Sequence, residues 1–76
     1  MTNIFSSRLE RLIKENKTTK YKIAKDLGCS KQTVCNWCDG MSEPSLGYLR
    51  SLANYFDVTA DYLIGLEDET GKKVTV

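Results

Sequence analysis

The sequence predicts an all-α domain built from five short helices. Apolar residues recur at intervals of three and four along most of the chain, which is the period of a helix that buries one face. Capping residues (Asn, Ser or Thr) precede these segments, and Gly or Asp residues follow several of them. Sustained alternation of polar and apolar residues occurs only in residues 73–76, which are too few to form a sheet. A chain of 76 residues has room for one domain.

The first helix is expected over residues 4–16. Asn3 or Thr2 can cap its start, because the side-chain oxygen of either residue accepts a hydrogen bond from a free N–H group of the first turn. Four apolar residues form one stripe along this helix: Phe5, Leu9, Leu12 and Ile13.

A second helix is expected over residues 20–27, after the polar segment 16–19. Thr18 or Thr19 can cap it. The residues that this helix would bury are Ile23, Ala24 and Leu27.

A third helix is expected over residues 31–38. Gly28 stands where the preceding helix needs a residue at positive φ in order to end, and Ser30 is placed as the next N-cap. Val34 and Trp37 form the inward pair of this helix, so we assign both to the core.

Two more helices are expected before the chain turns acidic. The fourth covers residues 45–56, with Pro44 in its first turn, where a missing N–H has no effect. Its apolar stripe is Leu46, Leu49, Leu52, Ala53 and Phe56. The fifth is capped by Thr59 and carries Tyr62, Leu63 and Leu66. We expect residues 1–66 to form the folded domain and residues 67–76 a flexible tail or the start of a linker.

Composition excludes several classes of protein. The three cysteines are odd in number and two fall in one predicted helix, so a disulfide framework is not expected and reduced thiols in a cytoplasm fit best. The chain has no His and no second C-x-x-C pair, so neither a metal nor another cofactor is expected. No apolar run is long enough for a signal peptide or a membrane span.

Charge is distributed unevenly along the chain. Residues 1–38 carry eight basic and three acidic side chains, a net charge of +5, whereas residues 39–76 carry three basic and seven acidic ones, a net charge of −4. Such asymmetry suggests that the first half faces a polyanion and leaves the second half for other contacts. The alternative interpretation is that these lysines simply lie on solvent-exposed helix faces.

Residues 20–37 have the pattern of a helix-turn-helix motif. Ala24 is small, as required where the two helices approach closely, and Gly28 permits the tight turn. Ser30 caps the second helix, whose N-terminus carries partial positive charge toward phosphates. Because Val34 and Trp37 hold this helix to the core, its opposite face is free to enter a DNA major groove.

Residues 5–66 resemble the lambda-repressor-like family of five-helix domains, the Cro and phage-repressor (XRE) type. The resemblance covers over three quarters of the chain. It rests on blocks that occur in the family's order and spacing, at 23–28, 30–34, 37, 40, 43–46 and 62–65. The family implies a cytoplasmic DNA-binding regulator encoded by a prokaryote or a phage.

The resemblance implies that helix 31–38 is the recognition helix. Its base-contacting positions correspond to Lys31, Gln32, Thr33 and Asn36. Lys can donate to guanine O6 and N7, Gln can bond adenine N6 and N7, Thr offers a methyl and a hydroxyl group, and Asn resembles Gln with a shorter reach. For each residue the alternative is an exposed side chain without a partner.

Backbone phosphates are expected at the helix starts and turns. Lys20 stands where many relatives have a Gln that bridges a phosphate and the recognition helix, so phosphate binding is expected of it and the bridging role stays open. Cys35 and Cys38 also replace residues that are usually polar or charged. The other phosphate candidates are Thr19, Tyr21, Lys22, Ser30, Ser42 and Ser45.

The expected function is transcriptional regulation, as a repressor that binds double-stranded DNA as a homodimer on half-sites about 34–36 Å apart. The expected dimer surface is the acidic C-terminal half, with Tyr55, Tyr62, Leu66 and the tail. Two alternatives keep the fold: a protein-interaction module, and an antitoxin-like repressor whose C-terminal part binds a toxin. An enzyme is not expected, because the chain lacks His, a nucleophile-base pair and a Gly-rich phosphate loop.

Overall fold

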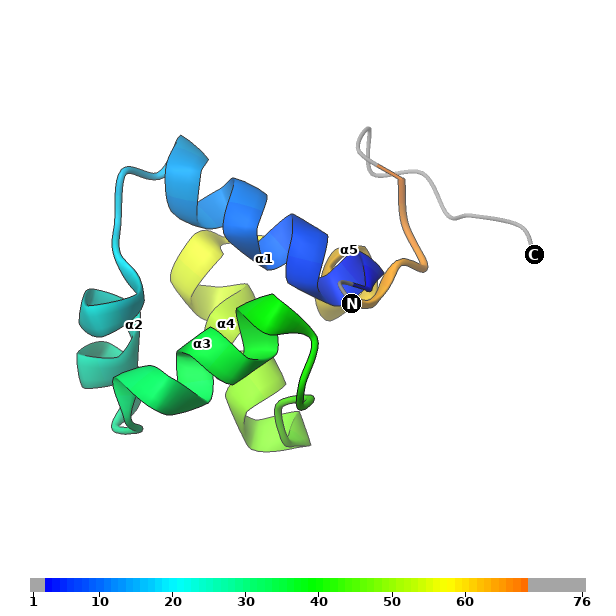
Figure 1. Cartoon of the computed structure of the whole chain (residues 1–76). Coiled ribbons are helices and arrows are strands. Elements are labelled where there is room, and N and C mark those ends of the chain that lie inside the picture. The colour runs from blue at the N-terminus through cyan, green and yellow to red at the C-terminus, as the bar shows by residue number, and fades with distance from the viewer. Residues whose placement is uncertain (1–2, 69–76) are drawn as a thin grey trace.

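A computed structural model of the chain describes residues 3–68 (Figure 1). Its helices are α1 (Ile4–Glu15), α2 (Lys20–Leu27), α3 (Lys31–Asp39), α4 (Leu46–Phe56) and α5 (Ala60–Ile64). Within residues 3–68, β-structure is limited to an isolated bridge at Glu67, so the prediction of an all-α, five-helix fold is confirmed. The predicted tail lies outside the described residues from position 69 onward.

All five helices begin at a polar residue that accepts a hydrogen bond from the backbone N–H three positions ahead. These N-caps are Asn3, Thr19, Ser30, Ser45 and Thr59. The two alternatives left open by the sequence are therefore resolved in favour of Asn3 and Thr19. Each such cap contributes about 1 kcal/mol to the stability of its helix.

The turn between α2 and α3 depends on Gly28. Its φ of 78° lies in the left-handed region, where a residue with a Cβ is strained. The N–H of Cys29 donates to the carbonyl of Ala24 at 2.9 Å, which closes the end of α2 and turns the chain toward α3. The predicted tight turn at Gly28 is confirmed.

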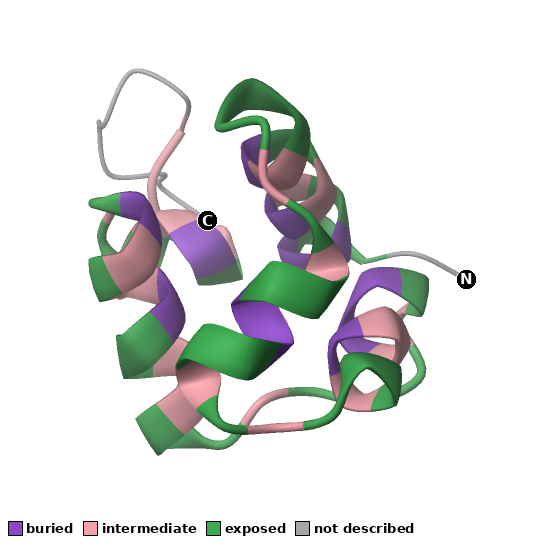
Figure 2. Ribbon diagram, turned by 90° about the vertical axis from the view of Figure 1, so that its left-hand side faces the viewer, coloured by how far each residue is buried: buried purple, intermediate pink, exposed green. Residues whose placement is uncertain are grey.

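The core lies where the five helices meet, as Figure 2 shows by the buried faces that turn inward. Trp37 is 2% exposed and packs against the ring of Tyr48, with 5.5 Å between ring centroids. The prediction that Trp37 and Val34 belong to the core is confirmed. The buried apolar residues are Phe5, Leu9, Leu12, Ile23, Ala24, Val34, Trp37, Cys38, Leu52, Phe56 and Leu63.

Several details of the C-terminal half differ from the sequence prediction. Pro44 lies before the N-cap of α4 rather than in its first turn, because the Ser45 hydroxyl accepts from Tyr48 N–H and sets the start of α4 one residue later. Leu46 is 84% exposed, because the first turn of α4 extends past the helices that cover the rest of its apolar stripe. Leu66 lies beyond α5, since Gly65 ends that helix in the left-handed conformation.

Four side-chain hydrogen bonds join elements that are distant in sequence. Buried Ser6 donates from Oγ to the carbonyl of Trp37 at 2.5 Å, which fastens α1 to α3. Arg8 donates to the carbonyls of Tyr62 and Glu67, which fastens α1 to α5 and to the segment after it. The hydroxyls of Thr18 and Tyr55 are 3.0 Å apart and join the α1–α2 loop to α4.

None of the helices in residues 3–68 has the length and apolar composition that a membrane span requires.

Candidate nucleic-acid interface

The helix α3 is held by one face only. Val34, Trp37 and Cys38 are buried on its inner side, and the Ser6 bond to the Trp37 carbonyl fixes its C-terminal end. Residues in a helix are about 100° apart around the axis, so Gln32 and Asn36 point away from this buried side, whereas Lys31 lies at its edge in the first turn. Lys31 and Gln32 are exposed, and Thr33 and Asn36 are half-buried.

Sequence reasoning missed the burial of Cys38. It lies four residues after Val34 and so falls on the same side of α3, a spacing that could have revealed it. Burial raises the pKa of the Cys38 thiol to about 11, although the positive charge of Lys20 opposes the shift. Burial also raises the pKa of Cys29. Both thiols therefore stay protonated at neutral pH. Within residues 3–68, no three metal-ligating side chains are grouped so that they could hold an ion.

Two hydrogen bonds order the outward face of α3. Gln32 donates from Nε2 to Oδ1 of Asn36 at 2.9 Å, one helical turn away. At the start of the helix the hydroxyls of Ser30 and Thr33 are 2.8 Å apart, while Ser30 Oγ also accepts from Thr33 N–H. Four polar side chains thus lie on one surface, and hydrogen bonds between them restrict their rotamers.

Three of the residues predicted to bind phosphate are the N-caps of α2, α3 and α4. The hydroxyl oxygens of Thr19, Ser30 and Ser45 each accept a backbone N–H, and all three residues are exposed. The hydroxyl hydrogen of Thr19 or Ser45 can still be donated to an anion at a helix end that is already positive. Ser42 is exposed in the loop before α4.

The remaining phosphate candidates lie in the first turn of α2. Tyr21 is 64% exposed, and Lys22 is exposed beside it. Lys20 is half-buried, with Nζ 4.0 Å from Oε1 of Glu10 on α1. The Lys20 ammonium is therefore partly exposed and has an acidic partner within the protein.

Comparison with known proteins agrees with this geometry. The model of a helix-turn-helix family matches residues 9–63. The chain belongs to the lambda-repressor-like helix-turn-helix family. Helix-turn-helix domains of this type bind double-stranded DNA.

Two relatives in Bacillus subtilis (strain 168) are named as uncharacterized HTH-type transcriptional regulators. YobD is 32% identical over 71 residues, which are 93% of this chain and 63% of YobD. YqaE is 32% identical over 71 residues, which are 93% of this chain and 60% of YqaE. The helix-turn-helix domain thus spans less than two thirds of the length of these two relatives.

Solved structures share the fold. The SOS-response repressor LexA of Eubacterium rectale is 38% identical, with a TM-score of 0.79 over 96% of this chain and 76% of the LexA chain. A transcriptional regulator of Listeria innocua is 32% identical, with a TM-score of 0.80 over 91% of this chain and 64% of its own. The DNA-binding domain of the P22 C2 repressor has the same fold, with a TM-score of 0.75 at 23% identity over 84% of both chains.

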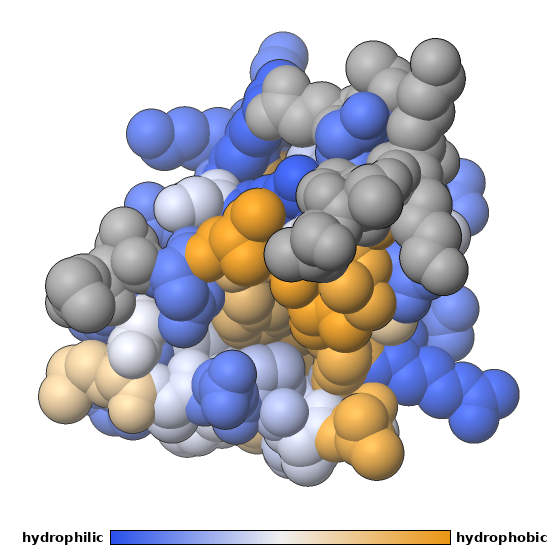
Figure 3. Space-filling model, turned by 90° about the vertical axis from the view of Figure 1, so that its right-hand side faces the viewer, coloured by the Kyte–Doolittle hydropathy of each residue, from blue (hydrophilic) through white to orange (hydrophobic). Residues whose placement is uncertain are grey.

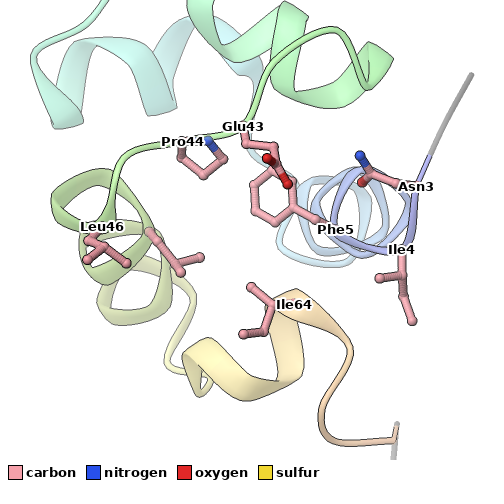
Figure 4. Close-up of a pocket in the computed structure, with 8 residues that line it drawn as sticks. Asn3, Ile4, Phe5, Glu43, Pro44, Leu46 and Ile64 are labelled. Carbon is pink, nitrogen blue, oxygen red and sulfur yellow. The ribbon is translucent and has the colours of Figure 1, made fainter. Parts of the chain in front are cut away.

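A second surface of the helix-turn-helix domain is apolar. Figure 3 shows apolar side chains gathered on the side of the molecule that carries α5, away from α2. They surround an open groove of about 390 Å³ between the start of α1, the loop before α4, the first turns of α4 and the end of α5 (Figure 4). Its lining residues are Asn3, Ile4, Phe5, Glu43, Pro44, Leu46, Leu49 and Ile64.

The groove depends on a close approach between α5 and the first residue of α1. A Cβ on Gly65 would lie 2.9 Å from Cγ2 of Ile4, and the φ of Gly65 is 91°. Glycine is therefore needed at this position for two reasons, and it lets Ile4 and Ile64 lie on the same side of the domain. Both isoleucines are exposed, as is Leu46.

Proposed function

We propose that this chain binds a specific double-stranded DNA sequence and represses transcription, with α3 in the major groove. The observation that carries the proposal is the one-sided anchoring of α3, which buries Val34 and Trp37 and leaves Lys31 and Gln32 exposed. A helix held in this way projects its exposed donors and acceptors outward, where they can reach base edges in a major groove. In this proposal Lys31, Gln32, Thr33 and Asn36 contact base edges.

Phosphate contacts would position α3 on the duplex. The N-termini of α2, α3 and α4 offer hydroxyl and N–H donors together with partial positive charge, and Lys20, Tyr21 and Lys22 surround the first of them. Such contacts set register and add affinity without selecting a sequence. The exposed Ser42 lies near enough to the start of α4 in sequence to belong to this set.

The repressor role is supported by the name of one similar structure, the SOS-response repressor LexA of Eubacterium rectale. A protein of this kind acts most simply by occupying a site and excluding other proteins from it.

A symmetric dimer is part of the proposal. The nine residues of α3 are about 13 Å long and span about four base pairs, too few to specify one site in a genome. Two copies on half-sites about 34–36 Å apart would specify twice as many base pairs.

Two of the residues expected at the dimer surface already have partners within the chain. Tyr55 is hydrogen-bonded to Thr18, and the guanidinium carbon of Arg8 lies 4.4 Å from the centroid of the Tyr62 ring. The apolar groove with Leu46 and Ile64 offers more unengaged apolar surface, so we place the dimer contact there.

Selection from random duplexes at a stated salt concentration tests this function. We expect enrichment of one sequence with two inverted half-sites, bound by two copies of the chain. If six to ten phosphates are contacted per dimer, affinity should fall about 10³–10⁵-fold between 50 and 200 mM salt. Failure to enrich any sequence, or an affinity that does not change with salt, would contradict the proposal.

The groove also favours a second candidate function, a protein-interaction module that has kept the fold and lost DNA binding. Exposed apolar side chains at Ile4, Leu46 and Ile64 would suit a foreign protein as well as a second copy. The same selection distinguishes the two functions, because a module that has lost DNA binding would hold no duplex more tightly than random DNA.

A further inference from the structure

The two amide side chains on the outward face of α3 are joined to each other. Gln32 and Asn36 are one helical turn apart, and the Nε2 of Gln32 donates to Oδ1 of Asn36 at 2.9 Å. Both residues point away from the buried side formed by Val34, Trp37 and Cys38. In this arrangement the Gln32 nitrogen faces Asn36, which leaves one N–H group and the oxygen of Gln32 for a base edge.

The hydrogen bond with Asn36 leaves part of the Gln32 amide available to a base edge. A primary amide has two N–H donors and one oxygen, and Gln32 uses one N–H on Asn36. Gln32 keeps one donor and its oxygen Oε1. In the major groove adenine presents one acceptor, N7, and one donor, the N6 amino group, which is the complement of this remaining set.

Other bases fit this orientation less well. Guanine presents two acceptors, N7 and O6, so the Gln32 oxygen would face a second oxygen. Thymine presents O4 and a methyl group, and cytosine presents only its amino group, so each can satisfy at most one of the two remaining Gln32 groups.

A free glutamine does not have this selectivity. The terminal torsion of a glutamine has a broad, nearly two-fold profile, so the amide can turn over and exchange the positions of its oxygen and nitrogen. Turned over, it would donate where it now accepts. With the Asn36 oxygen toward Gln32, as in this structure, only one of the two orientations is hydrogen-bonded, because only the nitrogen of Gln32 can donate to that oxygen.

We propose that Gln32 reads an adenine and that Asn36 is a positioning residue that holds the Gln32 amide in the orientation adenine requires. The proposal rests on the proposed DNA-binding function and adds to it the base that the site selects. It assigns the discrimination between adenine and guanine to a hydrogen bond within the protein rather than to Gln32 alone.

The experiment measures binding to duplexes that differ at one base pair, using the full chain and the best site from selection. At the position read by Gln32, the wild type should prefer adenine over guanine by about tenfold or more. Replacing that adenine with 7-deazaadenine removes the N7 acceptor and keeps base pairing, so the wild type should lose about tenfold. Gln32→Ala should abolish both effects.

Two variants of Asn36 separate positioning from direct contact. Asn36→Ala frees the Gln32 amide, so the preference for adenine over guanine should fall to within about threefold. Asn36→Asp keeps an oxygen that accepts from Gln32, so the preference should persist even though the added negative charge weakens binding to every duplex. Asn54→Ala, at an exposed position of α4, should change neither quantity and serves as the matched control.

Each outcome bears on the proposal in a definite way. An unchanged adenine preference in Asn36→Ala would overturn the positioning role, and a selected site whose affinity is insensitive to Gln32→Ala or to 7-deazaadenine would overturn the adenine contact. In both cases sequence-specific DNA binding would stand. Absence of specific binding by the wild type would overturn the proposed function and this inference with it.

Discussion

Replacing Ser6 with alanine tests how α3 is held on the domain. The Ser6 hydroxyl is buried and donates to the carbonyl of Trp37 in the last turns of α3. That carbonyl also accepts from the N–H of Gly40 at 3.3 Å, so it keeps one partner when the hydroxyl is removed. The loss is then close to the net value of one hydrogen bond, and we expect Ser6→Ala to lower the free energy of unfolding by about 1–1.5 kcal/mol.

Urea unfolding followed by tryptophan fluorescence measures this loss. Trp37 is the single tryptophan of the chain and is buried in the folded state, so its emission reports global unfolding. With a slope of about 1 kcal/mol/M for a domain of this size, the midpoint should fall by about 1 M, and the melting temperature by about 4–12 °C. Ser7→Ala, at the exposed neighbouring position, should stay within about 0.5 kcal/mol of wild type. Equal midpoints for Ser6→Ala and Ser7→Ala would refute the reasoning.

Three further predictions concern binding, assembly and pH. Lys20→Ala should weaken binding to the selected and to random duplexes by the same factor, whereas Gln32→Ala should lower the binding free energy by about 1–3 kcal/mol on the selected site alone. Titration of both duplexes with both variants measures these changes. If each variant lost the same binding free energy on the two duplexes, the prediction would be wrong. Leu46→Glu should prevent dimer formation on the operator without unfolding a residue that is 84% exposed, as judged by light scattering, with Ser51→Glu on α4 as its control. Because the folded pKa of Cys38 is about 11 against 9.0 for a free thiol, its contribution to stability is complete below pH 9 and is lost between pH 9 and 11. Unfolding free energies across that range should fall more steeply in wild type than in Cys38→Ala.

Local features of the fold could be predicted from the sequence because their causes are local. Ser30 and Gly28 act through their own backbone and the next turn, so their roles follow from residue type and spacing. The inward pair Val34 and Trp37 follows from helical periodicity for the same reason. The same periodicity places Gln32 opposite that pair and Lys31 to its side, at an exposed position of the first turn.

Features that depend on packing between distant elements could not be predicted in this way. Leu46 continues an apolar stripe, yet whether it is covered depends on where α1 begins and where α5 ends relative to α4. Tyr55 and Tyr62 look like free aromatic side chains in the sequence, and their partners Thr18 and Arg8 lie 37 and 54 residues away. The Gln32 bond to Asn36 is different, because the spacing of four residues between two amides is itself a signal for it.

The charge asymmetry of the sequence has a more specific meaning once these contacts are known. The net charge of +5 in residues 1–38 includes Arg8, whose guanidinium bonds two carbonyls near α5, and Lys20, whose ammonium is 4.0 Å from Glu10. Neither cation is as available to phosphate as the exposed Lys22 or Lys31. In the proposed complex the positive charge available to DNA is therefore smaller than the sequence total, and the exposed Lys22 and Lys31 lie in the first turns of α2 and α3. Phosphate contacts at those helix ends, rather than a general excess of lysine, should set the salt dependence of binding.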